Sequence, residues 1–308
     1  MSNWLDEGGV GRDWFGLDLF RLGPRFLRDG GRLFLLDQVG STNDFLRGRG
    51  EPAEGRQCLW DGWGWKGLER KTLQPLADPT SGTVVVARRQ TAGRGRQGRR
   101  WHDCDGLHLS VVVPPHRATF AQGFSVWLGL VTAMVLREDF QLGARLKWPN
   151  DIMVGRRKLG GILLENVGQG DQRRVVAGLG LNLGTRSSEF PSELQGAATS
   201  VRIEAGRQMK PGEVAGRIIT RVEDELDRFR AEGWRPYREA LVHMDSLLGR
   251  TVDVRQGSRS LTGRVEGIDE QGALLLRAAE GHLEHVPAGD VHLVTHPRDG
   301  KMEQGGRR

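Results

Sequence analysis

The residues best suited to chemistry lie in a glycine- and arginine-rich run. Residues 87–101 read ARRQTAGRGRQGRRW, with six arginines between Arg88 and Arg100. Glycine lets backbone N–H groups approach an anion closely, and guanidinium groups neutralise its charge. The run therefore predicts an anion-binding loop that orders on its ligand. It is not a P-loop, because the chain has no GxxxxGK[ST]. From composition alone, a solvated arginine-rich turn and a nucleic-acid-binding loop both stay open.

A second polar group lies at the end of the strand predicted at 144–148, in the segment KWPND. Pro149 stops the predicted strand, and Asn150 and Asp151 then offer oxygen atoms at its carboxyl end, where α/β sheets hold ligands. An amide beside a carboxylate suits a hard cation such as Mg²⁺ carried by a nucleotide. The alternative is an Asx turn that closes a hairpin.

Two further segments combine a predicted strand with glycine. In RKLGGILLE at 157–165, Lys158 enters an apolar strand beside Gly160 and Gly161. A lone lysine there is usually a solvated strand end, but paired glycines let a ligand lie against the backbone. The alternating glycines of GLGLN at 178–182 again indicate close backbone approach. They do not form a dinucleotide fingerprint, because no third glycine opens a helix.

Apolar periodicity predicts the elements that position these segments. Ser41 begins a short helix as its N-cap. The segment 47–80, rich in Gly, Pro, Arg and Trp, has no clear period and is expected to be a long loop or insertion. Strands are predicted at 33–36, 84–86, 107–113, 144–148, 158–166 and 174–183. Helices are predicted at 121–140, 212–230 and 235–246.

The composition changes after Leu248, and short alternating stretches separated by glycine turns follow as far as about Val294. They lie at 252–254, 264–266, 273–276 and 291–293. This pattern predicts a small β-barrel of about 45 residues. The last dozen residues are polar and expected to be disordered.

The bulk properties narrow the class. The 308 residues favour one large and one small domain. The net charge of +6 and the pI of about 9.9 are compatible with nucleic acid, with acidic substrates or with an arginine-rich genome. No run approaches the roughly 20 apolar residues of a membrane span, and no secretory signal is expected. Cys58 and Cys104 have no metal-ligand or CxxC spacing and are expected to be free thiols in a reducing cytoplasm.

In this order and spacing, the motifs closely resemble those of the biotin protein ligase family. They are STN at 41–43, GRGRQGR at 93–99, KWPND at 147–151, RKLGGILLE at 157–165 and GLGLN at 178–182. The resemblance covers about residues 33–294 and includes a C-terminal stretch similar to the family's small SH3-like domain.

The resemblance implies an α+β fold. A mixed β-sheet with packed helices, similar to the catalytic domains of class II synthetases, would be followed by a small C-terminal SH3-like barrel. We expect an N-terminal extension at 1–32 and a catalytic domain at 33–246 that includes the 47–80 insertion. The SH3-like domain is expected at 247–296 and a tail at 297–308.

The resemblance also implies a reaction and its residues. Biotin would react with ATP to give biotinyl-AMP, with Mg²⁺ as a cofactor, and would then be transferred to a lysine of a biotin carboxyl carrier protein. The catalytic residues would be Lys158, Arg94, Arg96 and Asp151, with Asp151 also a candidate base for the transfer. The biotin-binding set would be Ser41, Thr42, Asn43, Gln90, Gly93, Arg94, Gly95, Arg96, Lys158, Gly160 and Gly161. The ATP-binding set would be Arg96, Arg99, Trp101, Lys147, Asn150, Asp151, Lys158 and Asn182, with Asn150 and Asp151 near the metal.

Some features depart from the family or favour a rival. Gly184 stands where the family often has a second Asn, which puts nucleotide contacts there in doubt. The 47–80 insertion is longer than usual and is interpreted as a surface loop rather than a carrier-docking element. Residues 1–32 are too short for the helix-turn-helix domain of repressor-type members, so no specific DNA partner is expected; a homodimer stays open. The rivals are a lipoate-type ligase of the same fold and an arginine-rich nucleic-acid-binding protein.

Overall fold

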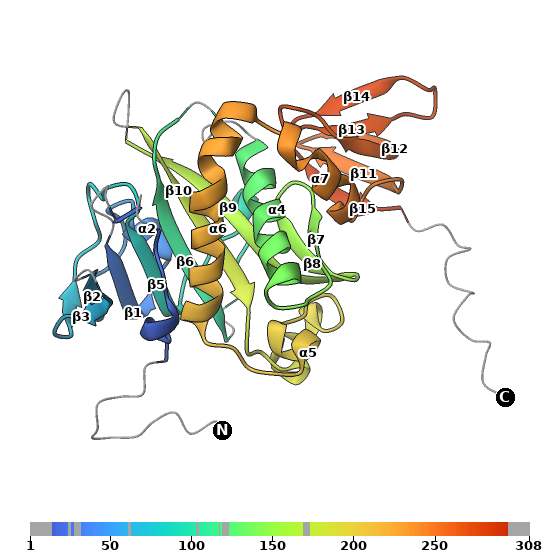
Figure 1. The fold of residues 1–308 in the computed structure, drawn as a ribbon. Coiled ribbons are helices and arrows are strands. Elements are labelled where there is room, and N and C mark those ends of the chain that lie inside the picture. Colours follow the sequence, from blue (N-terminus) through green and yellow to red (C-terminus); the bar gives the residue numbers. More distant parts are fainter. Residues whose placement is uncertain are drawn as a thin grey trace.

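The computed structural model describes residues 14–23, 26–27, 32–60, 63–102, 105–116, 118, 123–168 and 173–294. Two β-sheets organise these residues (Figure 1). The larger runs in the order β3-β2-β1-β5-β6-β10-β9-β8-β7, with β4 also paired to β2. The smaller has the order β14-β13-β12-β11-β15. The expected N-terminal extension lies mostly outside the described residues, and the expected tail and Cys104 lie wholly outside them.

The large sheet is mixed. Strands β1 (Leu33–Val39) and β5 (Val84–Gln90) pair in parallel, and the remaining pairings described in this sheet are antiparallel. The other central strands are β6 (Gly106–Val113), β10 (Arg174–Asn182) and β9 (Arg157–Val167). The two edges of the sheet are formed by β2 (Ala53–Trp60), β3 (Trp65–Gly67), β4 (Lys71–Leu73), β7 (Ala144–Lys147) and β8 (Asp151–Val154).

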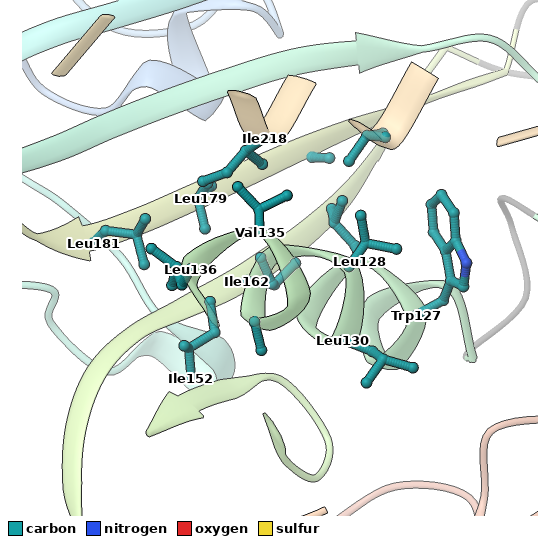
Figure 2. Packing of buried hydrophobic residues seen from close by; sticks show 14 of the residues in the cluster. Trp127, Leu128, Leu130, Val135, Leu136, Ile152, Ile162, Leu179, Leu181 and Ile218 are labelled. Carbon is teal, nitrogen blue, oxygen red and sulfur yellow. The ribbon is translucent and has the colours of Figure 1, made fainter. Parts of the chain in front are cut away.

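Two long helices cover one face of this sheet. Helix α4 (Gly123–Glu138) contacts β7, β8 and β9, and α6 (Pro211–Glu232) packs beside it, as Figure 1 shows. Twelve of the sixteen residues of α4 are buried. This helix therefore lies at the centre of the core rather than on its surface. In Figure 2 its side chains, including Trp127 and Leu136, pack against Ile152, Ile162 and Leu179 from the sheet and Ile218 from α6.

The smaller sheet is antiparallel throughout and matches the SH3-like part expected from the sequence. Its strands are β11 (Thr251–Gln256), β12 (Arg259–Ile268), β13 (Leu274–Arg277), β14 (Leu283–Val286) and β15 (Asp290–Leu293). It touches the larger part closely. The indole N–H of Trp148 donates a 2.9 Å hydrogen bond to the Gly272 carbonyl, and there is no room for a Cβ on Gly272 because Gly123 Cα would lie 2.2 Å away.

The predicted strands and the three predicted helices are present within a few residues of their expected bounds. Short helices complete the described chain: α2 (Thr42–Phe45), α5 (Val201–Ala205) and α7 (Arg238–Met244), with 3-10 turns η1 (Leu17–Leu19), η2 (Arg96–Gly98), η4 (Ser187–Glu189), η5 (Ser192–Leu194) and η6 (Arg235–Tyr237). No helix among the described residues is long and apolar enough to cross a membrane.

The prediction that 47–80 lacks regular structure is wrong, because β2, β3 and β4 lie there. Strand β2 alternates between buried and exposed residues over its first four positions, and its buried residues, Ala53, Gly55 and Cys58, are small. Small residues contribute little to hydrophobic periodicity, so the sequence pattern did not indicate a strand here. Cys58 is fully buried in β2.

Candidate active site

A pocket opens where the two sheets meet. Its walls come from the β1–α2 turn, the end of β5 and the loop after it, the turn between β7 and β8, the strands β6, β9 and β10, and the edge strand β15. The lining residues are Ser41, Thr42, Asn43, Gln90, Arg94, Gly95, Arg96, Arg99, Arg100, Trp101, Leu109, Lys147, Trp148, Pro149, Asn150, Asp151, Lys158, Gly161, Ile162, Leu163, Gly178, Leu179, Gly180, Asp290, Val291 and His292.

One end of the pocket is a neutral hydrogen-bonding group. The backbone N–H and the hydroxyl of Thr42 both donate to Gln90 Oε1, at 2.8 and 3.1 Å. The Ser110 hydroxyl lies 2.7 Å from Thr42 Oγ1 and 2.6 Å from Asn43 Oδ1, so it can donate to either. All four side chains are buried. Amide and hydroxyl groups held in this way are pre-oriented for a neutral ligand that both donates and accepts hydrogen bonds.

The alternating glycines of β10 make room for two of the site's side chains. A Cβ at Gly178 would lie 2.4 Å from Asn43 Oδ1, and one at Gly180 would lie 2.7 Å from the Trp101 ring. Real Cβ atoms essentially never make contacts this short. The glycines therefore let Asn43 and Trp101 lie directly against the strand, which is the close approach that GLGLN predicted.

The glycine- and arginine-rich run folds back on itself. The Gly95 N–H donates to the Arg99 carbonyl at 2.7 Å, and the Trp101 N–H donates to the Gly93 carbonyl at 2.9 Å. The tip is the 3-10 turn η2, in which Gln97 adopts a left-handed φ of 56°. Residues 93–101 thus form a narrow, hairpin-like loop, and its stem continues the β5 strand.

Cations gather at the other end of the pocket. Lys158 Nζ lies 2.5 Å from Asp151 Oδ1 and 5.8 Å from the centre of the Trp101 ring. Arg96 Nη1 donates to Asn150 Oδ1 at 3.4 Å. Burial lowers the pKa of Arg96 and of Lys147, although Asp151 opposes this for both. Because the charged forms are partly desolvated and only partly compensated by carboxylates, this end favours an anionic ligand.

Two more arginines of the loop pair with other parts of the chain. Arg94 Nη2 donates to Asp44 Oδ1 at 2.7 Å and to Glu165 Oε2 at 3.1 Å. Arg99 forms an ion pair with Asp290 of β15. The loop is therefore tied both to the wall of the large sheet and to the small sheet.

Comparison with known proteins identifies the relatives of this chain. The Biotin/lipoate A/B protein ligase family model matches residues 69–182, and the Biotin protein ligase C terminal domain model matches residues 247–294. The bifunctional ligase/repressor BirA of Escherichia coli (strain K12) is 33% identical over 269 residues, covering 86% of this chain and 75% of that protein. This chain belongs to the biotin protein ligase family. The biotin--[acetyl-CoA-carboxylase] ligase of Paracoccus denitrificans is 35% identical over 231 residues, covering 70% of this chain and 92% of that enzyme.

A solved structure agrees with this assignment to the biotin protein ligase family. The biotin protein ligase from Aquifex aeolicus, in complex with biotin and ATP, has a TM-score of 0.66 and 26% sequence identity. The match covers 86% of this chain and 99% of that one. Together with the C-terminal domain model over residues 247–294, this match confirms the α+β fold with a small C-terminal sheet.

Most of the site residues predicted from the sequence line this one pocket. Three do not line it. A Cβ on Gly93 would meet the Trp101 carbonyl at 2.9 Å, and one on Gly160 would meet the Gly180 carbonyl at 2.5 Å, so both glycines serve close packing. Asn182 is buried, and its amide donates to the Thr199 carbonyl at 2.9 Å.

Other residues of the site were not predicted from the sequence. Ser110 does not line the pocket but hydrogen-bonds the lining residues Thr42 and Asn43; the available signal was a lone hydroxyl within the apolar run LHLSVVV. Asp290, Val291 and His292 come from the C-terminal sheet, and no local pattern indicates that they reach a pocket more than a hundred residues away along the chain.

The fit of a metal ion depends on the oxygen atoms in the pocket. Among the lining residues of the described chain, Asp151 and Asp290 are the only carboxylates. The described residues contain no group of three or more His, Cys, Asp or Glu side chains that could hold a metal. This sparse set suits an Mg²⁺ ion that arrives with the phosphates of a nucleotide, rather than one held by the protein alone.

Proposed function

We propose that this ligase uses the pocket to join biotin to ATP as biotinyl-5′-AMP and then transfers biotin to a lysine of a biotin carboxyl carrier protein. The observation that carries the proposal is that one pocket has a neutral hydrogen-bonding end and a cationic end. Thr42, Asn43 and Gln90 line this end and suit the ureido ring of biotin, which has two N–H donors and one carbonyl acceptor. Ser110 hydrogen-bonds Thr42 and Asn43. The cations suit its carboxylate and the phosphates of ATP.

In the first step, a carboxylate oxygen of biotin attacks the α-phosphorus of ATP, the P–O bond to the bridging oxygen breaks, and pyrophosphate leaves. Both reactants are anionic, so positive charge must lie between them. Lys158 and Arg96, at the cationic end of the pocket, would supply it, and the negative charge that grows on the non-bridging oxygens would strengthen these contacts in the transition state. Mg²⁺ bound with the phosphates would add positive charge, and Asp151 and Asn150 would hold the ion.

The nucleotide half would occupy the part of the pocket lined by Trp101, Arg99 and Lys147. Trp101 presents an aromatic ring beside Lys158, a surface on which a base can stack. Burial lowers the pKa of Lys147, and the neighbouring Asp151 carboxylate opposes that shift by favouring the charged ammonium, the form that a phosphate ligand requires. Holding both substrates in one pocket also supplies the orientation that an in-line displacement needs.

In the second step, a neutral lysine amine of the carrier attacks the carbonyl carbon of the mixed anhydride, and AMP leaves with the bridging oxygen. The incoming amine must lose a proton, and Asp151 is the candidate acceptor, since its carboxylate lies within the pocket. Lys158 would then stabilise the departing AMP. We propose that the carrier is the biotin carboxyl carrier domain of a carboxylase and that both proteins meet in the cytoplasm; the homodimer stays a prediction.

The test is a mass measurement on a purified biotin carboxyl carrier domain incubated with the protein, biotin and Mg-ATP, with lipoate as the control substrate. The expected result is a biotin-sized addition that requires ATP and does not occur with lipoate. Biotin-dependent pyrophosphate release without that addition would overturn the choice of carrier. If folded protein gave neither signal, the proposed reaction would be wrong.

A further inference from the structure

Four charged side chains close a ring of ion pairs at the outer wall of the pocket. Arg47 Nη1 lies 3.4 Å from Asp44 Oδ1 and 2.5 Å from Glu165 Oε1. Arg94 Nη2 lies 2.7 Å from the same Asp44 oxygen and 3.1 Å from Glu165 Oε2. Each carboxylate therefore contacts both arginines. We refer to Asp44, Arg47, Arg94 and Glu165 as the ion-pair ring.

The ion-pair ring joins three separate segments of the chain. Asp44 lies in α2 and Arg47 just after it, Arg94 lies in the stem of the 93–101 loop, and Glu165 lies in β9. Side chains alternate along a strand, so Glu165 is on the same face of β9 as Leu163, which lines the pocket. The ring thus fastens the loop stem to the wall beside the proposed biotin end.

The ion-pair ring differs from ordinary surface salt bridges. The side chains of Arg47, Glu165 and Asp44 are only 13%, 19% and 22% exposed, and that of Arg94 is 37% exposed. Two cations face two carboxylates, so the charges balance locally. Partly shielded networks of this kind are screened less by salt than isolated exposed pairs and hold their members in a defined geometry.

One contact links the ion-pair ring directly to the neutral end of the pocket. The Asn43 side-chain amide donates to Glu165 Oε2 at 2.8 Å, and its carbonyl oxygen Oδ1 lies 2.6 Å from the Ser110 hydroxyl. Because Glu165 can only accept, it fixes which way the Asn43 amide points. The Asn43 oxygen is therefore held toward Ser110 and the pocket.

We propose that the ion-pair ring is a positioning device for biotin, and that Asp44, Arg47 and Glu165 are positioning residues of this enzyme. The inference rests on the proposed function. It also assigns Arg94 a different role from the catalytic one expected from sequence. Its guanidinium is neutralised by two carboxylates on the outer wall, whereas Arg96 and Lys158 lie at the cationic end. Arg94 holds the loop stem, and the other cations meet the phosphates.

The decisive experiment is a double-mutant cycle of Asp44→Asn and Arg94→Gln, with Glu266→Gln as the control. Glu266 pairs with Arg277 in the C-terminal sheet, away from the pocket. Each ring variant is expected to raise the biotin KM and Kd by about tenfold, with the ATP KM and the adenylation rate at saturating biotin within about twofold of wild type. The biotin KM and Kd of the double variant are expected to be no higher than those of either single variant, because either substitution alone already breaks the ion-pair ring.

Two results would overturn the proposal. If Arg94→Gln slowed adenylation at saturating biotin by about 100-fold while Asp44→Asn did not, Arg94 would be a catalytic cation. If the effects of the two substitutions on biotin affinity simply multiplied, the residues would act independently. Arg47→Gln provides a second ring variant should Asp44→Asn fail to fold.

A measurement that does not depend on activity separates this inference from the proposed function. Amide hydrogen exchange of residues 91–101 in biotin-free protein is expected to be about tenfold faster in Asp44→Asn and Arg47→Gln than in wild type or Glu266→Gln. Unchanged exchange would refute the ring's role in holding the loop. If wild type bound no biotin at all, the proposed function would fail, but the exchange result would still decide what the ring does.

Discussion

The alternating glycines of β10 allow the two ends of the pocket to be perturbed separately. In Gly178→Ala the new methyl group would lie 2.4 Å from Asn43 Oδ1, and in Gly180→Ala it would lie 2.7 Å from the Trp101 ring. Ordinary van der Waals contact begins at 3.4 Å, so Asn43 must move by about 1 Å and Trp101 by about 0.7 Å. Displacements of this size at an active site cost up to about 100-fold.

We therefore expect opposite kinetic signatures from neighbouring substitutions. Gly178→Ala should raise the biotin KM by about 10- to 100-fold with the ATP KM little changed, and Gly180→Ala should do the reverse. The assay is initial-rate pyrophosphate release with each substrate varied in turn, with thermal melts to confirm folding. Gly143→Ala is the control, because its methyl group would meet only Val154, at 3.9 Å. Equal effects of both substitutions on both KM values would refute the assignment of the two ends.

Three further predictions concern catalysis, pH dependence and the junction between the sheets. Lys158→Ala should slow biotin-dependent pyrophosphate release on the order of 100-fold, and an unchanged rate would remove Lys158 from the mechanism. Burial raises the pKa of Asp245 to about 6. The protonated form thus favours folding, and up to about 3 kcal/mol of stability is present below pH 3.8 and lost as the pH rises through 6. Asp245→Asn, which keeps the acceptor for the Leu247 N–H, should raise the melting temperature at pH 8 but not at pH 4; equal shifts at both would contradict this. Trp148→Phe should lower the unfolding free energy by about 1 kcal/mol in denaturant titrations, because Gly272 loses its donor, and no change would show that this bond adds nothing.

The elements and site residues that could be predicted from the sequence are those with strong local patterns. The strands that carry Gln90, Lys158 and Gly180 are rich in apolar residues and bounded by turn residues, so their positions could be predicted. The motifs beside these strands consist of particular side chains in a fixed order. That order restricts the possible functions much more than any single motif does. The pocket gathers these motifs from segments far apart in the chain.

The features that were missed depend on contacts between distant segments. Asp44 and Glu165 look like ordinary surface charges in the sequence, and only the fold shows that both meet Arg94. Strand β2 was missed because its buried positions, such as Ala53 and Gly55, are small. Pairing partners compensate for weak local patterns, and a single sequence does not reveal those partners.

The contact between the two sheets limits how this enzyme can be re-engineered. Asp290 reaches Arg99 from β15, while Gly272 meets Gly123 and Trp148 from the turn before β13. The C-terminal part is thus joined to the rest of the chain at two points, one on β15 and one in the turn before β13. A chimera that takes this sheet from a relative would also exchange part of the pocket wall. For the hybrid to keep its activity, the new sheet must fit the catalytic part at both points of contact.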